Sequence, residues 1–313
     1  MKEFTNILVA ITHTHYSSDE FIKAIELALA NDAKLTIIAI DDPITRFAEK
    51  TMLGKLKELF TKQLQEILND FKDQAEKANV RSVSTEIRWG KSYIEILKMV
   101  QEQNFDLVIK MADPFVNFSR RRLTGDDLHL LRKSSVPVWL IVDNERHPGK
   151  INKVLVAVDS EFDDPERVKL NRKLLDYADS ISQMEDAQLH ILQVWSLYGE
   201  ERLRGPFINM AEDEIDQLLT KTRTENEKAL HDLLITQQLE RDGVFPHLVK
   251  GKASEEIHRV AEELNIDMIV MGTVGRTGLA GYVIGNTAEN VLSETSCSIL
   301  AIKPDGFKAE KIK

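Results

Sequence analysis

The chain has 313 residues, 42% of them hydrophobic and 29% charged, which is the composition of a globular protein long enough for two domains. Its net charge of -10 and pI of about 5.4 argue against direct nucleic-acid binding as the main role. No apolar run reaches the roughly 18 residues of a transmembrane helix, and no signal-peptide pattern is visible, so a cytoplasmic protein without a membrane partner is expected. Cys297 is the single cysteine, which excludes an internal disulfide, and it is expected to be a small core residue at the start of a strand.

Apolar runs of strand length alternate along the chain with segments of helical spacing. In chain order, strands are expected at 6–12, 35–42, 87–91, 105–111, 136–142, 153–159, 189–195, 248–252, 266–272 and 297–303. Helices are expected at 18–31, 56–75, 92–104, 126–134, 164–183, 215–234, 254–264 and 286–295. This alternation predicts parallel sheets with helices on both faces, because the connection between parallel strands is a right-handed helical crossover.

The strand-like runs recur in the same order in the two halves of the chain. The corresponding runs are 6–12 with 153–159, 35–42 with 189–195, 87–91 with 248–252, 105–111 with 266–272, and 136–142 with 297–303. Two residue pairs share one offset, since Gly90 and Gly251 are 161 residues apart and so are Asp106 and Asp267. The chain is therefore expected to contain a repeat.

The polar segment 143–152, with Pro148 and Gly149, is the expected linker between the two copies. We predict two tandem, doubly wound α/β domains, each with a five-stranded parallel sheet, at residues 1–145 and 151–305. In such a sheet, ligands bind beyond the carboxyl ends of the strands.

A glycine-rich segment follows the fourth strand of the second copy. Five of the chain's 14 glycines lie within fourteen positions: Gly272, Gly275, Gly278, Gly281 and Gly285. Glycine allows a backbone to approach phosphate oxygens and to adopt positive φ. The helix that follows Gly285 presents N–H groups and a positive dipole end, and the hydroxyl of Thr273 adds a donor. A phosphate-binding loop is predicted here, with a flexible loop as the alternative.

The spacing Gly272-x2-Gly275-x9-Gly285 resembles the ATP-binding loop of universal stress proteins, G-x2-G-x9-G-(S/T). The segments DLVIKMA, HLLRKSSVPVW and GTVGRTGLAGYVIGNTAE are similar to the tandem-domain E type of that family. The resemblance covers nearly the whole chain. It implies an adenine nucleotide alpha hydrolase-like fold, a role in the stress response, and binding of ATP or a related adenine nucleotide in the second copy.

The same resemblance implies the residues of the site. Adenosine contacts fall on Val158, Asp159 and Val194, and ribose contacts on Met271 and Gly272. The implied phosphate contacts are Gly275, Arg276, Gly285, Asn286 and Thr287. Asn286 departs from the family's Ser/Thr, and its amide still donates to phosphate but does not replace a hydroxyl as a Mg²⁺ ligand. A Mg²⁺ ion is therefore expected to contribute less than the backbone.

The first copy lacks this pattern. Its residues at the positions of Asp159, Gly272, Thr273 and Gly275 are, in that order, Thr12, Met111, Ala112 and Pro114. Gly125 alone survives, and it is followed by Asp126 and Asp127. These carboxylates are good helix caps but are expected to repel a phosphate. One nucleotide site per chain is therefore predicted.

A binding module is favoured over an enzyme, because the sequence shows no Ser-His-Asp or Cys-His grouping and no evident general base beside the loop. Two alternatives are a slow ATPase and a carrier of an apolar ligand in the first copy, where Phe115, Val116 and Phe118 replace glycines. The run Arg120 to Arg122 is expected to be a solvated or ion-paired face, with docking of an anionic partner as the alternative.

The resemblance also implies how the two copies assemble. Domains of the family pair through their last strands, so 136–142 and 297–302 are expected to form the junction of a pseudo-dimer within one chain. A homodimer of whole chains is left open.

Overall fold

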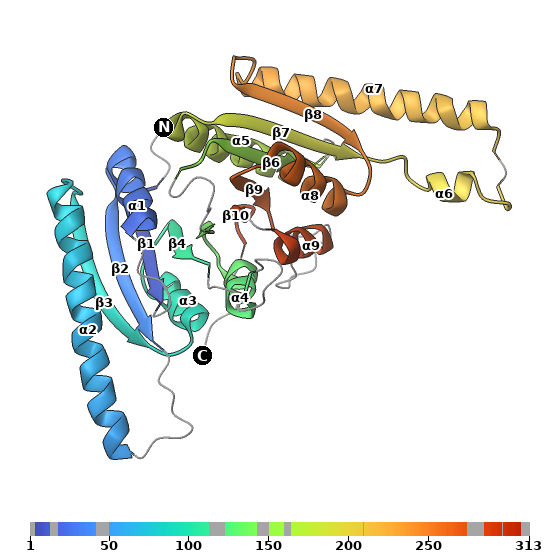
Figure 1. Cartoon of the computed structure of the whole chain (residues 1–313). Helices are drawn as coiled ribbons and strands as arrows, with labels where there is room; N and C mark the ends of the chain where they lie inside the picture. Colours follow the sequence, from blue (N-terminus) through green and yellow to red (C-terminus); the bar gives the residue numbers. More distant parts are fainter. Residues whose placement is uncertain are drawn as a thin grey trace. The chain divides into compact units, whose positions relative to one another are not determined.

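The computed structural model describes residues 4–12, 18–41, 50–112, 123–142, 150–159, 164–208, 210–273, 285–295 and 297–307 (Figure 1). The chain packs as two compact units, one made of residues 1–150 with 273–313 and the other of residues 151–272. The division into copies at 1–145 and 151–305 concerns the sequence repeat and stays a prediction. Among the described residues, no helix is long and apolar enough to cross a membrane.

The first unit contains a sheet in the order β3-β2-β1-β4-β5-β10. Its strands are β1 Asn6–Thr12, β2 Lys34–Asp41, β3 Ser82–Trp89, β4 Leu107–Met111, β5 Val138–Ile141 and β10 Ser298–Ile302. Its helices are α1 Ser18–Asn31, α2 Lys50–Lys77, α3 Ser92–Glu102, α4 Gly125–Lys133 and α9 Asn286–Glu294. The first five strands are parallel, and β10 pairs antiparallel with β5 at the junction expected from the sequence.

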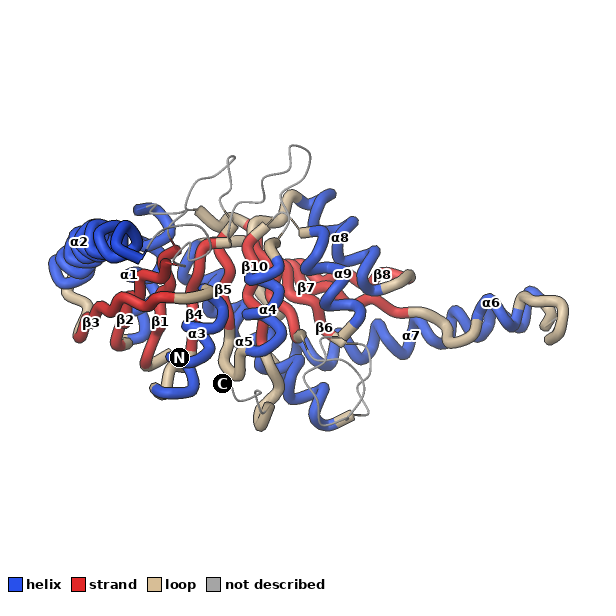
Figure 2. Tube along the Cα trace, turned by 90° about the horizontal axis from the view of Figure 1, so that it is seen from below, coloured by secondary structure: helices blue, strands red, loops and turns tan. Residues whose placement is uncertain are grey.

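The second unit contains four parallel strands in the order β9-β6-β7-β8. They are β6 Lys153–Val158, β7 Gln188–Trp195, β8 Val244–Lys250 and β9 Met268–Gly272. Its helices are α5 Pro165–Glu185, α6 Glu200–Leu203, α7 Glu212–Thr236 and α8 Ala253–Leu264. In Figure 2 the strands, in red, are flanked by helices, in blue. The predicted α/β architecture of parallel strands and crossover helices is confirmed.

Two strands begin earlier than predicted. The runs 87–91 and 248–252 mark only the ends of β3 and β8, which start at Ser82 and Val244. Both strands have mixed burial rather than a continuous buried run, and β8 carries an exposed proline, Pro246, which suits a strand at the border of its unit. The expectation for Cys297 was wrong, because it precedes β10 and is only half-buried.

The repeated aspartates have the same structural role in both copies. Asp106 accepts hydrogen bonds from the backbone N–H groups of residues 5 and 6, at 2.6 and 3.0 Å. Asp267 accepts from the backbone N–H groups of residues 152 and 153, at 2.8 and 3.0 Å. Each carboxylate thus satisfies donors where the neighbouring strand begins, which accounts for their identical spacing in the repeat.

The repeated glycines lie in turns from strand to helix. Gly90 has a φ of +147°, and a Cβ at Gly251 would lie 2.6 Å from the Cγ of Glu256. The corresponding carboxylate in the first copy, Glu95, lies against Gly90 in the same way. A side chain at either position would therefore displace the glutamate of the following helix.

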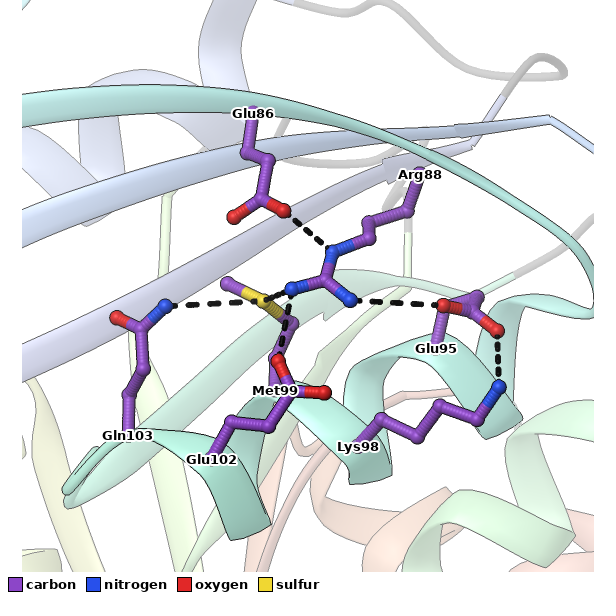
Figure 3. Close-up of polar contacts among 7 residues, drawn as sticks. All are labelled: Glu86, Arg88, Glu95, Lys98, Met99, Glu102 and Gln103. Carbon is purple, nitrogen blue, oxygen red and sulfur yellow. Dashed lines mark hydrogen bonds and ion pairs between the residues drawn. The ribbon is translucent and has the colours of Figure 1, made fainter. Parts of the chain in front are cut away.

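An ion-pair cluster joins β3 to α3 in the first unit (Figure 3). Arg88 on β3 lies 2.5 Å from a carboxylate oxygen of Glu86, 2.8 Å from one of Glu102 and 3.9 Å from one of Glu95. Lys98 pairs with Glu95 at 2.9 Å. Three carboxylates around one guanidinium hold the strand against the helix beside it.

Two histidines meet across β7 and β8. The Nδ1 atom of His190 lies 3.0 Å from the Nε2 atom of His247, and the rings are stacked. Burial lowers the pKa of His190 to about 4, with smaller contributions from His247 and Lys153. Burial also lowers the pKa of His247. Both rings are therefore neutral at pH 7.

We predict that this pair makes the protein sensitive to acid. The unfolded chain binds a proton on His190 below its ordinary pKa of 6.5, whereas the folded chain excludes that proton until about pH 4. The free energy of unfolding should therefore be undiminished above pH 6.5 and fall as the pH is lowered towards 4. Urea denaturation between pH 7.5 and 5 measures this slope.

The variant His190→Leu should have a flatter pH profile over the same range. His231→Leu is the matched control, because the side chain of His231 is 60% exposed. Equal slopes for the parent and His190→Leu would show that the pair does not govern acid stability.

Candidate functional site

The two ends of the predicted phosphate loop are hydrogen-bonded to each other. The backbone N–H of Gly285 donates to the carbonyl of Thr273 at 3.3 Å, and the N–H of Thr273 donates to the carbonyl of Ile302 at 3.2 Å. These bonds bring the two ends together at the carboxyl end of β10. Gly275 and Arg276 lie outside the described residues, so their predicted phosphate contacts stay predictions.

Helix α9 begins directly at the end of this loop. Gly285 is its N-cap residue, with φ -65° and ψ 141°, and it offers no side chain to cap the first turn. Asn286 and Thr287 follow and are exposed. The dihedral angles of Gly285 suit any residue, so the absence of a Cβ, rather than positive φ, distinguishes glycine at this position.

The residues with implied ribose contacts end β9. The side chain of Met271 is buried, so only its backbone remains for contact with a ribose. Gly272 is half-buried, and a Cβ there would lie 3.0 Å from a methyl carbon of Leu170 on α5. Close packing of the strand on a helix therefore favours glycine at this position, independently of any ligand.

Asp159 follows β6 and is held through its backbone. Its N–H donates to the side chain of Asn171 at 2.9 Å, and the Asn171 amide donates back to its carbonyl at 3.0 Å. The carboxylate pairs with Arg167 at 3.1 Å and is 35% exposed. Of the other implied adenosine contacts, Val158 is buried and Val194 half-buried. Sequence reasoning missed Asn171, although an asparagine on the apolar face of a helix was the available signal.

A buried lysine lies behind the loop entrance. The ammonium of Lys303 donates to the hydroxyl of Thr273 at 2.5 Å and lies over the ring of Phe307. Burial lowers the pKa of Lys303 to about 7. Thr273 is fully buried and its hydroxyl accepts from Lys303, so the expectation that this hydroxyl faces a phosphate was wrong. Lys303 was not singled out from the sequence, where it simply ends an apolar run.

The first copy has a buried ion pair at the corresponding place. Lys110 of β4 donates to Asp127 of α4 at 2.8 Å, and both side chains are inaccessible to solvent. The offset of 161 residues relates them to Met271 and Ala288 in the second copy. A charged pair thus stands where the second copy has two apolar side chains.

Asp127 also closes the start of α4. Its carboxylate accepts from the hydroxyl of Thr124 at 2.8 Å and from the Thr124 N–H at 3.2 Å, in a capping box. Thr124, and not Gly125, is the N-cap residue that corresponds to Gly285, which corrects the assignment of Gly125 as the surviving glycine. Asp127 is not a free repelling charge, because Lys110 offsets it.

Several sequence predictions fall on residues that the structure does not describe. Pro114, the apolar residues Phe115, Val116 and Phe118, and the run Arg120 to Arg122 all lie within 113–122. In the described part of the chain, no three His, Cys, Asp or Glu side chains converge as a metal site would require.

Comparison with known proteins identifies relatives of the whole chain. The model of the universal stress protein family matches residues 3–141 and again 150–303. Universal stress protein E of Salmonella typhi is 31% identical over 72% of this chain and 70% of its own length. A universal stress protein E homolog of Haemophilus influenzae is 26% identical and covers 96% of this chain and 98% of its own length.

Solved structures share the fold over nearly the full length. A functionally unknown protein from Pseudomonas aeruginosa PAO1 superimposes with a TM-score of 0.72 at 25% identity, covering 98% of this chain and 95% of that chain. A universal stress protein from Archaeoglobus fulgidus gives a TM-score of 0.62 at 18% identity, covering 95% of this chain and 98% of that chain. Since the family model matches both halves, the chain belongs to the universal stress protein family.

Proposed function

We propose that this stress protein binds one adenine nucleotide, ATP or a close relative, and that the glycine loop of its second copy holds the phosphates. Gly275, Arg276, Gly285, Asn286 and Thr287 are the proposed phosphate ligands. The adenosine contacts with Val158, Asp159 and Val194 and the ribose contacts with Met271 and Gly272 belong to the same proposal.

The difference between the two helix starts carries the proposal. The first N–H groups of a helix have no partner within it and attract an anion. In α4 the carboxylate of Asp127 already accepts at the cap, and Lys110 balances its charge. In α9 the cap is Gly285, and Ala288 stands at the position of that carboxylate. An external phosphate therefore suits α9 and not α4.

The residues around this helix start fit a phosphate. The exposed side chains of Asn286 and Thr287 bring an amide and a hydroxyl to the first turn, and both groups donate hydrogen bonds. The backbone bond between Gly285 and Thr273 holds the loop ends in place. Donors of this kind would hold the phosphates of ATP, which supports the proposal of a binding module.

Replacing the loop glycines tests the site directly. Gly275→Val and Gly285→Val place a branched side chain where a phosphate oxygen would approach the backbone. Loss of two or three charge-assisted hydrogen bonds, roughly 1.5–3 kcal/mol each, should weaken ATP binding by at least about tenfold to a hundredfold. Isothermal titration calorimetry measures the affinity, and melting curves report the fold.

The control for these variants is Gly125→Val, since a Cβ at Gly125 of the first copy meets no atom within 4 Å. This control should bind ATP as the parent does. If the folded Gly275→Val and Gly285→Val proteins bind with the parent's affinity, the loop is not the site.

The stoichiometry is a second test. Because Asp127 occupies the helix start in the first copy, titration with ATP should saturate at about one nucleotide per chain. Two equivalent sites would contradict the assignment of the first copy as closed.

The buried ion pair gives a third prediction, on stability. Asp127→Ala leaves the Lys110 ammonium buried without its carboxylate and should destabilise the first unit by about 3–5 kcal/mol. The double variant Lys110→Met/Asp127→Ala copies the Met271 and Ala288 of the second copy and should recover much of that loss. Urea denaturation of the full chain measures both variants.

Asp126→Ala is the matched control for this pair, because Asp126 is its half-buried neighbour in the same helical turn. It should stay close to the parent in stability. A double variant less stable than Asp127→Ala would show that the pair stabilises the fold through more than mutual neutralisation.

A further inference from the structure

Helix α2 extends beyond the sheet that it covers. Its C-terminal half buries Leu64, Leu68 and Phe71 in the first unit, whereas its N-terminal half projects past the ends of β2 and β3 (Figure 1). The apolar spacing continues towards the N-terminal end of the helix, where Leu59 is 63% exposed and Phe60 43% exposed. An apolar helix face that runs on past its own sheet is typical of a binding surface.

The exposed half of α2 is basic. Residues 54–65, called here the basic half-helix, contain the lysines Lys55, Lys57 and Lys62 and the single acid Glu58. Lys57 lies over the ring of Trp89, at 4.9 Å. Lys55 and Lys62 are exposed and flank the apolar residues.

A second projecting surface, in the other unit, is acidic. Residues 196–208 and 210–220, called here the acidic arm, comprise α6 and the first part of α7 and extend past the end of β7 (Figure 1). Phe207 is fully exposed, and Tyr198 and Ile208 are exposed as well. The arm contains two cations, Arg202 and Arg204, of which Arg204 pairs with Glu200 and Glu212. Six carboxylates outnumber them: Glu200, Glu201, Glu212, Asp213, Glu214 and Asp216.

We propose that the basic half-helix of one chain binds the acidic arm of a second copy of the same chain. Both surfaces expose aromatic and aliphatic side chains, and the net charges of the two segments are opposite. Charge complementarity around an apolar centre sets both the choice of partner and the orientation of an interface. Every chain carries one surface of each kind, so each of two chains offers the other a complementary surface.

Charge reversal tests this pairing. Lys55→Glu/Lys62→Glu makes both surfaces of a chain acidic, and Asp213→Lys/Glu214→Lys removes the negative character of the arm. The parent should be a dimer at micromolar concentration, weakened by 1 M salt, which shortens the screening length to about 3 Å. Each double variant should raise the dissociation constant at least about tenfold, measured by sedimentation velocity.

Mixing the two variants supplies the decisive measurement. An equimolar mixture offers the basic helix of one variant to the acidic arm of the other, a contact that neither variant can make with itself, so association should rise above that of either variant alone. The matched control is Lys72→Glu/Lys77→Glu, which makes the same change in charge on the half of α2 that packs on the sheet. Circular dichroism verifies that every variant is folded, and the control should dimerise as the parent does.

Three results would overturn the proposal: a monomeric parent across the micromolar range, undiminished association of either charge-reversed variant, or a mixture that stays monomeric. A parent that remains monomeric while binding another protein would assign the two surfaces to a different partner and would equally exclude self-association.

Discussion

The requirement that the first N–H groups of a helix find acceptors organises both halves of this protein. In each half a helix begins beyond the carboxyl end of the fourth strand, at Gly125 in one and Asn286 in the other. The first copy meets the requirement internally with a capping box, in which the Thr124 hydroxyl accepts from the Asp127 N–H and the Asp127 carboxylate accepts from the Thr124 N–H. Once that carboxylate is buried it needs a cation, and Lys110 on the adjacent strand supplies it. A side chain therefore occupies the position at which we propose that the other copy binds a ligand.

The second copy meets the same requirement differently. With Gly285 at the cap, α9 has Ala288 at the position of Asp127, and its first-turn acid, Glu289, pairs with Arg132. The copy still has a buried lysine at this edge, Lys303, which donates to the hydroxyl of Thr273. An uncharged helix cap, whose first N–H groups have no partner within the helix, favours an anion from outside. The two copies thus combine the same elements, a lysine and a helix start, in opposite ways.

Most of the fold followed from the sequence because apolar periodicity is strong where strands are buried on both sides. The runs at 6–12 and 18–31 were predicted to the residue. The starts of β3 and β8 were missed, since strands with mixed burial lack a continuous apolar run. In the candidate site, spacing identified the glycines, but it paired Gly125 with Gly285. The N-cap residue of α4 that corresponds to Gly285 is Thr124, one position earlier. The burial of Lys110 and Asp127 depends on contact between a strand and a helix 17 residues apart, which no local pattern reports.

The two copies agree where strands must be anchored and differ where surfaces are exposed. The shared anchors are Asp106 with Asp267, Gly90 with Gly251, and Glu95 with Glu256. Even where the carboxylates correspond, their cations differ: Arg88 reaches Glu102 from a strand, whereas Arg259 reaches Glu263 from within the same helix. The projecting helices follow the same rule, since one is basic and the other acidic although both extend from the same kind of sheet edge. Few side chains can satisfy buried backbone N–H groups at the start of a strand, so these residues are the same in both copies. Exposed charges contribute little to stability and can therefore differ, so the same fold presents two different surfaces.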